Sequence, residues 1–326
     1  MAKTTIGIIG LGKMGGNLAL QALEKGYAVA GYSQKLNPEL QQAGVQVEKT
    51  LPELVQKLPS PRIIFLYIPA GSAVDQLLDQ LSVLVSPGDI LVDGGNSYWG
   101  DSIRRAEKLK AKGIHLIDCG TSGGVAGARN GACFMAGGDP EAIKIVGPIL
   151  KELAVENGYL HTGASGSGHF VKLVHNGIEF GMLQAIGEGM ALLSAYRDDL
   201  DVSTILKVWN HGSVIRSWLI ELMDKIYTEK QGFEKVPSYI EDTGEVNWLV
   251  ADALRMEIPV PVISQSVMQL FASRETKHIA DKAIAMMRHG FGGHPFGEDA
   301  GIKHERKTGK VENEQTGFLY NRPKKE

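Results

Sequence analysis

Three glycines near the start of the chain follow a short apolar run and precede a helical pattern. Residues 6–9 form the run, and Gly10, Gly12 and Gly15 follow it as G-x-G-x-x-G. In this context the first glycine permits a tight turn, the second lets a pyrophosphate approach the backbone, and the third lets helix and strand pack closely. Free amides at the helix start then bind phosphate. The pattern predicts a dinucleotide-binding βαβ unit rather than a glycine-rich turn without a ligand.

Apolar runs alternate with helical patterns up to about residue 165, and beyond that point only helical segments follow. We therefore predict an α/β fold in three parts: an N-terminal Rossmann-type doubly wound sheet over 1–165, an all-α substrate and dimerisation domain over 166–300, and a C-terminal tail over 301–326. The predicted strands cover residues 5–9, 27–32, 62–67, 90–93, 115–118, 132–136 and 158–161. The predicted helices of the second domain cover residues 167–196, 202–210, 215–228, 244–256 and 261–289.

The residues after the second predicted strand bear on the choice between NAD and NADP. In NAD-binding folds an acidic residue about 20 positions after the glycines holds the ribose 2′-hydroxyl. Here that position is Ser33, and Gln34 and Lys35 follow it. A hydroxyl, an amide and an ammonium can each bind a 2′-phosphate, and no carboxylate repels it. The sequence favours NADP and keeps NAD as the alternative, with Lys35 then an ordinary surface lysine.

Composition argues against several classes of function. The 326 residues are 43% hydrophobic and carry a net charge of −3. The chain therefore lacks the excess of basic residues that is typical of nucleic-acid-binding proteins. No apolar run approaches the length of a membrane span, and the first strand begins too early to leave room for a signal peptide. The two cysteines, Cys119 and Cys133, lack metal-ligand spacing. They predict reduced thiols in a cytoplasmic protein.

Residues 168–179, GHFVKLVHNGIE, carry the clearest sign of chemistry. Four polar residues, which we call the polar stripe, lie there at helical spacings i, i+3, i+4 and i+7: Lys172, His175, Asn176 and Glu179. Unlike titratable groups placed together can be tuned to different proton-transfer tasks. Apolar neighbours favour burial over a solvated charged face. His175 and Glu179 also have the spacing of a helical metal pair, but no third ligand is evident, so we predict no metal.

Polar motifs end three of the predicted strands. They are IPAG at Ile68, DGGNS at Asp93 and DCGTSGG at Asp118. Ligands bind at the carboxyl ends of strands in doubly wound sheets. We therefore expect these loops to surround one site.

Taken together, these motifs closely resemble the short form of the decarboxylating 6-phosphogluconate dehydrogenases. The resemblance covers nearly the whole chain and rests on GIIGLGKMGGNLA, DGGNS, TSGG, GHFVKLVHNGIE, SVIRSW at Ser213 and RHGFGGH at Arg288. The glycine turn alone would indicate only the wider β-hydroxyacid dehydrogenase superfamily, whereas the polar stripe indicates a much smaller group of proteins within it. The resemblance implies oxidation and decarboxylation of 6-phospho-D-gluconate to ribulose 5-phosphate and CO2, as in the pentose phosphate pathway, by a homodimer or homotetramer.

The resemblance also implies a role for each polar residue. Lys172 would be the general base that takes the proton of the substrate 3-hydroxyl and then, as an ammonium, stabilises the enediol after CO2 is lost. Glu179 would protonate C1. The residues implied to bind the sugar acid are Asn96, Ser122, Gly123, Gly124, His175, Asn176 and Arg216, with Arg288 and His294 supplied by a partner subunit. The residues implied to bind the cofactor are Gly10, Leu11, Gly12, Lys13, Met14, Gly15, Ser33, Gln34, Lys35, Ile68, Pro69 and Asn96.

Part of the implied phosphate pocket departs from the family pattern. Phe180, Asn247 and Leu249 stand where relatives carry a tyrosine, a basic residue and a threonine, and Ala126 replaces a bulky aromatic residue after TSGG. Loss of a cation and two hydroxyls should weaken the binding of a dianion. The substrate is then either 6-phosphogluconate held by other groups or a gluconate with a sulfonate or hydroxyl at C6.

Two further interpretations compete with a decarboxylating enzyme. A non-decarboxylating β-hydroxyacid dehydrogenase or imine reductase would share the glycine turn, the TSGG loop and often a lysine, but would need neither the His175–Asn176 pair nor Glu179. A dinucleotide-sensing regulatory or scaffold protein on the same fold would need no proton-transfer groups at all.

Overall fold

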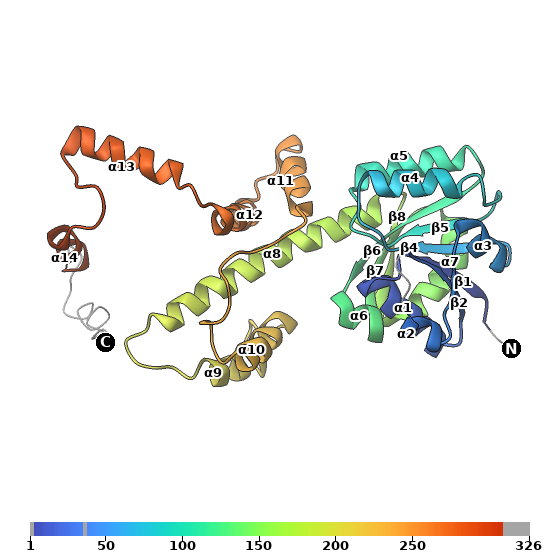
Figure 1. Cartoon of the computed structure of the whole chain (residues 1–326), viewed down its shortest axis with the longest axis horizontal. Helices are drawn as coiled ribbons and strands as arrows, with labels where there is room; N and C mark the ends of the chain where they lie inside the picture. Colours follow the sequence, from blue (N-terminus) through green and yellow to red (C-terminus); the bar gives the residue numbers. More distant parts are fainter. Residues whose placement is uncertain (1–2, 35–37, 309–326) are drawn as a thin grey trace. The chain divides into compact units, whose positions relative to one another are not determined.

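The computed structural model describes residues 3–34 and 38–308, and within them it forms one eight-stranded sheet (Figure 1). The strands are β1 Thr5–Ile9, β2 Ala28–Tyr32, β3 Gln46–Glu48, β4 Ile63–Leu66, β5 Ile90–Asp93, β6 His115–Ser122, β7 Ala132–Gly137 and β8 Ala154–Gly163. Their order is β3-β2-β1-β4-β5-β6-β7-β8, with all pairs parallel except β6–β7. The predicted α/β class is confirmed, and β7 and β8 run opposite to the other six strands.

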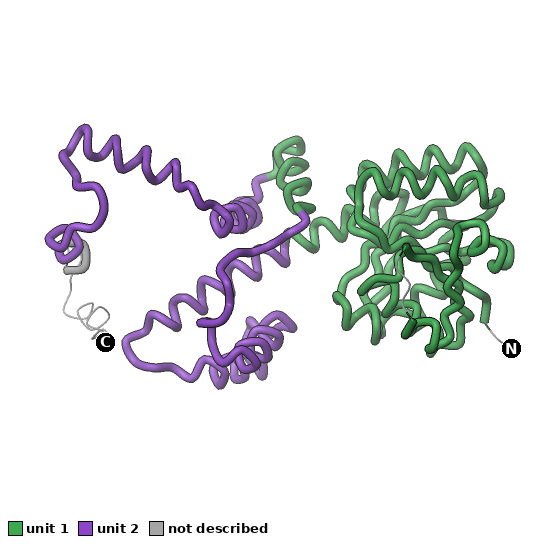
Figure 2. The backbone as a smooth tube through the Cα atoms, viewed as in Figure 1, with its two compact units in different colours: residues 1–177, 244–258 green, residues 178–243, 259–326 purple. Residues whose placement is uncertain are grey.

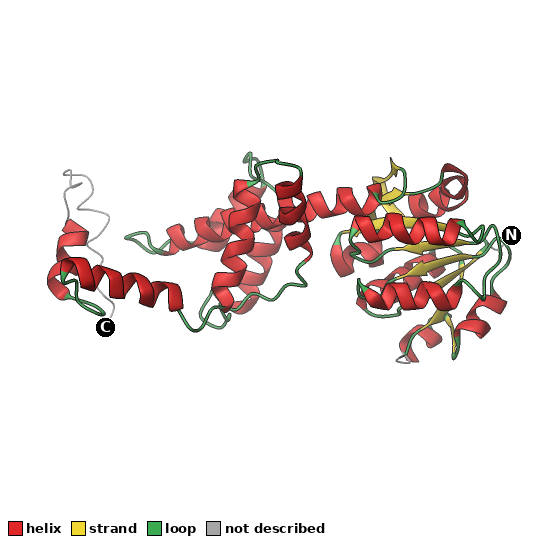
Figure 3. Ribbon diagram, turned by 90° about the horizontal axis from the view of Figure 1, so that it is seen from above, coloured by secondary structure: helices red, strands yellow, loops and turns green. Residues whose placement is uncertain are grey.

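Helices lie on both sides of this sheet (Figure 3). They are α1 Lys13–Glu24, α2 Pro38–Gln42, α3 Leu51–Lys57, α4 Ser72–Leu81, α5 Trp99–Lys110, α6 Gly124–Asn130 and α7 Pro140–Leu153. Alternate strand residues point to opposite faces, so Ile6 and Ile8 pack in a core with α1 and α7. Ile9 and Leu91 pack in a second core with α3, α4 and α5. Both faces of the sheet are therefore buried.

The remaining helices follow the sheet in the chain. They are α8 Ser167–Ser194, α9 Val202–Asn210, α10 Trp218–Lys230, α11 Glu245–Arg255, α12 Pro261–Arg274, α13 Ile279–Gly292 and α14 Ala300–Thr308. The chain divides into two compact units, one of residues 1–177 and 244–258 and the other of residues 178–243 and 259–326 (Figure 2). The division falls within α8 and assigns α11 to the first unit. The domain boundaries at residues 165 and 300 stay a prediction.

The single long helix predicted over 261–289 is wrong, because the chain forms α12 and α13 with a break between them. The Glu275 carboxylate accepts hydrogen bonds from the backbone N–H groups of Lys277 and His278. These bonds replace the next helical turn, and His278 takes the left-handed conformation with φ 53°. Helix α13 then continues through Gly292, and Gly293 follows it in the left-handed conformation at φ 65°.

Candidate active site

The glycine turn fits a dinucleotide in a way that separates the roles of its three glycines. A Cβ on Gly10 would lie 2.2 Å from the Tyr67 carbonyl oxygen, and one on Gly15 would lie 2.1 Å from the Gly10 carbonyl oxygen. Packing of β1, α1 and β4 therefore requires both glycines. A Cβ on Gly12 would meet nothing within 4 Å. Gly12 thus leaves open space at the start of α1, where the helix begins without a side-chain cap or an acidic first turn, and where phosphate is favoured.

The other residues around this turn differ in what they can offer a cofactor. Leu11 is buried in the core and occupies the space over Gly31, so only its backbone is available. Lys13 is exposed and Met14 is half-buried in the first turn of α1. Lys13 can therefore supply charge beside the phosphate site.

The other residues expected to bind the cofactor follow β2 and β4. Ser33 is half-buried and Gln34 is exposed directly after β2, while Lys35 lies outside the described residues. Ile68 is half-buried and Pro69 is exposed directly after β4. These two loops leave the same carboxyl edge of the sheet as the glycine turn, because β1, β2 and β4 are parallel neighbours.

Helix α8 begins in direct contact with the sheet. A Cβ on Gly168 would lie 2.3 Å from the Asp118 carbonyl oxygen and 2.4 Å from that of Met135. The Asp118 carboxylate accepts the backbone N–H groups of Gly166 at 2.6 Å and His169 at 2.9 Å, which anchors the first turn of the helix. Burial raises the pKa of Asp118 above its ordinary value, although both N–H bonds favour the ionised form.

Three members of the polar stripe and one residue of β6 form a cluster, which we call the Lys172 cluster: Lys172, His175, Asn176 and Ser122. Lys172 is only 7% exposed, and its Nζ donates to Asn176 Oδ1 at 2.7 Å and lies 3.4 Å from His175 Nδ1. His175 Nε2 lies 3.0 Å from Ser122 Oγ. Gly120 makes room for the lysine, since a Cβ there would lie 2.4 Å from Lys172 Cβ. The cluster places a buried amine within reach of an amide oxygen and an imidazole nitrogen.

The remaining member of the stripe, Glu179, is half-buried one turn beyond His175 on α8. The helix geometry expected for the stripe is therefore present over its full length. The proton-transfer roles of Lys172 and Glu179 stay predictions.

Two loops carry the other candidate substrate residues of the first unit. After β5, the buried Asp93 accepts the Gly95 N–H at 3.1 Å and the Ser97 hydroxyl at 2.7 Å, and Asn96 between them is exposed. After β6, Gly123 and Gly124 adopt left-handed φ values of +113° and +58°. A Cβ on Gly124 would meet nothing within 4 Å, so backbone there is open to a ligand.

The structure adds a contribution from α11 that the sequence pattern did not predict. Asn96 Nδ2 donates to Glu245 Oε1 at 3.2 Å, and the buried Asp252 carboxylate accepts Tyr98 OH at 2.9 Å and Trp99 Nε1 at 2.7 Å. Helix α11 is therefore fixed to the segment that follows DGGNS. An acidic residue on the apolar face of a predicted helix is a signal that could have indicated this buried contact.

The three departures in the implied phosphate pocket differ in their surroundings. Leu249 is 7% exposed and lies on the buried face of α11. Asn247 is exposed on the same helix, and Phe180 is half-buried on α8. Leu249 therefore has a packing role of its own in this chain.

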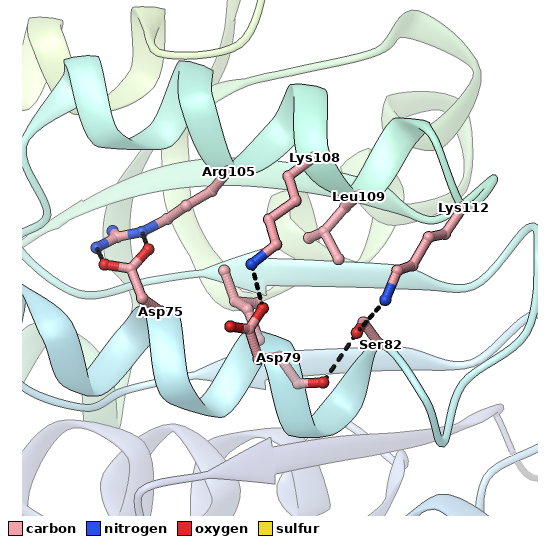
Figure 4. A pocket seen from close by; sticks show the side chains of 8 residues that line it. Asp75, Asp79, Ser82, Arg105, Lys108, Leu109 and Lys112 are labelled. Carbon is pink, nitrogen blue, oxygen red and sulfur yellow. Dashed lines mark hydrogen bonds and ion pairs between the residues drawn. The ribbon is translucent and has the colours of Figure 1, made fainter.

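A buried arginine supports two of the loops. Arg105, 2% exposed, donates to both Asp75 carboxylate oxygens at 3.0 and 3.1 Å, to the Gly71 carbonyl at 2.9 Å and towards Ser97 Oγ at 3.4 Å. The guanidinium lowers the pKa of Asp75 to about 2. Figure 4 shows the row of contacts between α4 and α5 to which this pair belongs: Arg105–Asp75, Lys108–Asp79 and Lys112–Ser82.

Three of the residues implied to bind the sugar acid lie in the second unit: Arg216, Arg288 and His294. Arg216 is exposed between α9 and α10. Arg288 NH2 and His294 Nδ1 are 3.5 Å apart. Their role at the substrate stays a prediction.

Among residues 3–34 and 38–308, no group of three His, Cys, Asp or Glu side chains is arranged to hold a metal ion. Over the same part of the chain, no helix has both the length and the apolar character to cross a membrane.

The chain matches two family models in succession. Residues 5–163 match the NAD-binding domain of 6-phosphogluconate dehydrogenase, and residues 168–306 match the C-terminal domain of the same enzyme. The chain is 40% identical to the NAD(+)-dependent, decarboxylating 6-phosphogluconate dehydrogenase of Haloferax volcanii, over 89% of this chain and 97% of that protein. It is 44% identical to Bacillus subtilis YqeC, whose name assigns it provisionally to this activity, over 89% of this chain and 98% of YqeC.

A solved structure agrees with these matches. The 6-phosphogluconate dehydrogenase of Plasmodium falciparum, described with NADP+ and with 6-phosphogluconate, superposes with a TM-score of 0.77 at 30% identity, over 91% of this chain and 66% of that one. A 3-hydroxyisobutyrate dehydrogenase of Salmonella typhimurium, with a TM-score of 0.69 at 22% identity, shares the fold. The chain belongs to the 6-phosphogluconate dehydrogenase family.

Proposed function

We propose that this chain oxidises and decarboxylates 6-phospho-D-gluconate to ribulose 5-phosphate and CO2, with reduction of NADP or NAD. The observation that carries the proposal is the Lys172 cluster, a buried amine held 2.7 Å from Asn176 on the helix that leaves the dinucleotide-binding sheet. A lysine in a desolvated site can serve as a base near neutral pH. A protein that only senses dinucleotides needs no proton-transfer group of this kind.

In the proposed reaction, Lys172 takes the proton of the substrate 3-hydroxyl as the C3–H bond breaks. The bound nicotinamide would supply the hydride acceptor. The product of this step is a β-keto acid, which loses its carboxyl group as CO2. Lys172, now an ammonium, donates to the carbonyl oxygen and stabilises the enediol. Glu179 then protonates the carbon that becomes C1 of the ketopentose. Asn176 and His175 hold Lys172 in place through both protonation states.

The C6 group of the substrate must bind without the cation and the two hydroxyls of the implied phosphate pocket. Asn247 and Leu249 carry no charge, and Leu249 belongs to the buried face of α11. Arg216 together with Arg288 and His294 of a partner subunit would then supply the anion contacts, because a guanidinium binds phosphate bidentately. A gluconate with a sulfonate or hydroxyl at C6 is the second candidate, and the same three departures favour it.

One assay panel tests the function and the cofactor together. Purified protein is incubated with gluconate, 6-phosphogluconate and a C6-sulfonate analogue, each with NAD and NADP, while reduced nicotinamide and CO2 are both measured. We expect equal amounts of reduced nicotinamide and CO2, with 6-phosphogluconate as the preferred substrate. NADP should be the preferred cofactor, because Ser33 and Gln34 present no carboxylate to a 2′-phosphate. Oxidation without CO2 would identify a non-decarboxylating dehydrogenase instead.

We further propose a cytoplasmic homodimer or homotetramer. Both cysteines are free thiols, as a reducing compartment favours. Helix α13 buries none of its residues against the described part of the chain, and Ile284, Met287 and Phe291 on it are 51%, 61% and 77% exposed. An apolar helix of this kind is suited to packing on another subunit.

Subunit mixing tests whether each active site is shared. Arg288→Ala and Lys172→Met variants are prepared separately, and each is expected to be inactive. If Arg288 serves the partner's site, a hybrid dimer contains one site with both lesions and one with neither, so activity should return on subunit exchange. Mass spectrometry of differently tagged subunits checks that exchange has occurred. Confirmed exchange without recovered activity would show that Arg288 acts in its own chain or in none.

A further inference from the structure

A buried histidine lies one helical turn before Lys172 and has no part in the proposed chemistry. His169 is 2% exposed. Its Nε2 lies 3.1 Å from the Asp93 carbonyl oxygen at the end of β5, and its Nδ1 lies 2.7 Å from Ser102 Oγ on α5. Its backbone N–H donates to Asp118 on β6. One residue of α8 thus contacts three separate elements of the sheet layer.

The partner of Nε2 determines the role of that ring nitrogen. A carbonyl oxygen only accepts, so Nε2 carries the proton and donates to Asp93. Nδ1 forms a hydrogen bond of 2.7 Å with Ser102 Oγ, and the Ser102 hydroxyl lies 3.3 Å from the Tyr98 carbonyl oxygen, to which it can donate. Both ring nitrogens are satisfied, as a buried imidazole requires.

Asp93 connects the histidine to the loop that carries Asn96. Its carbonyl binds His169, and its carboxylate accepts the Gly95 N–H and the Ser97 hydroxyl on either side of Asn96. Arg105 NH1 lies 3.8 Å from the same carboxylate. Asp93 is therefore fixed at its backbone by α8 and at its side chain by the loop.

We propose that His169 is a positioning residue that fixes where Lys172 lies relative to Asn96. The inference rests on the proposed function, in which the base on α8 and the cofactor- and substrate-binding loop after β5 must act on one substrate carbon. Close packing presses α8 on β6 at Gly168, and the His169–Asp93 hydrogen bond links the same turn to β5. A displacement of about 1 Å at a reacting centre can lower the rate roughly 10²-fold.

Two substitutions at one position separate alignment from simple stability. The Gln side chain is long enough to place its amide near Nε2 and donate to Asp93, whereas Asn reaches only the Nδ1 position beside Ser102. We expect His169→Asn to lower kcat roughly 10²-fold and His169→Gln to stay within about tenfold of wild type. NADPH affinity, measured by its fluorescence, should be unchanged in both, because the glycine turn is untouched.

Ser102→Ala is the matched control. It removes the partner of Nδ1 and leaves the Asp93 bond in place. It should lower the melting temperature while kcat per folded molecule stays close to wild type. Ser97→Ala is a second variant that tests the link through Asp93. It removes one hydrogen bond to the Asp93 carboxylate without altering His169, and it should lower kcat in the same way as His169→Asn.

The outcomes distinguish this inference from the proposed function. A wild-type enzyme that does not turn over any substrate of the panel overturns the proposed function and this inference with it. In an active enzyme, equal kcat for wild type, His169→Asn and Ser97→Ala overturns the inference alone. If His169→Asn does not fold, the Ser97→Ala result decides by itself. Equal loss in the Asn and Gln variants would likewise contradict a role for the Asp93 bond.

Discussion

Lys172→Met is expected to lower the rate of nicotinamide reduction by roughly 10²–10⁴-fold while cofactor binding survives, because it removes the general base and keeps an apolar stem of similar length. The stem packs against Gly120 and should stay there. Lys172 lies in α8 and not in the glycine turn, so the site for the dinucleotide is unchanged. Reduced nicotinamide formation and NADPH fluorescence, measured on the same preparation, check the two parts of the prediction.

Lys144→Met on α7 is the control for removing a lysine charge. That side chain is 69% exposed and pairs with Glu141 on the surface, so its loss should leave kcat and stability nearly unchanged. Near-normal turnover in Lys172→Met would contradict the assignment of the base. Loss of NADPH binding in that variant would instead place Lys172 in the cofactor site.

Much of the fold could be predicted because its signals are local. A buried parallel strand such as β4 is an unbroken apolar run, and the strand–glycine–helix order fixes the first βαβ unit. Strand β3 has one apolar residue, Val47, and could not be distinguished from a loop by its pattern. The break after α12 has neither glycine nor proline, and it depends on the Glu275 carboxylate bonding to backbone two and three residues later.

The candidate site divides in the same way. The polar stripe could be predicted because helical spacing alone places its residues on one face. The His175–Ser122 contact and the Asn96–Glu245 contact join residues 53 and 149 positions apart, which no local pattern encodes. The contacts of His169 could not be predicted, because a single histidine in an apolar helix gives no sign of its partners, and those partners lie on β5 and α5.

Gly168→Ala is expected to destabilise the protein by at least about 3 kcal/mol, at the upper end of the usual cost of overpacking. The added Cβ would lie 2.3 Å from the Asp118 carbonyl oxygen, 2.4 Å from that of Met135 and 2.7 Å from the Gly137 nitrogen. All three are backbone atoms of β6 and β7, so no flexible side chain can move aside. Helix propensity alone would predict the opposite sign, a gain of about 0.5–1 kcal/mol.

The comparison with Gly189→Ala decides which effect is larger. Gly189 lies in the same helix, and a Cβ there would meet nothing within 4 Å of the chain. Urea unfolding of both variants should therefore move the midpoint in opposite directions, down for Gly168→Ala and unchanged or up for Gly189→Ala. Any folded fraction of Gly168→Ala should also turn over slowly, because the start of α8 must rise from the sheet and carry Lys172 with it. Equal stability of the two variants would show that α8 does not depend on this close contact for its position.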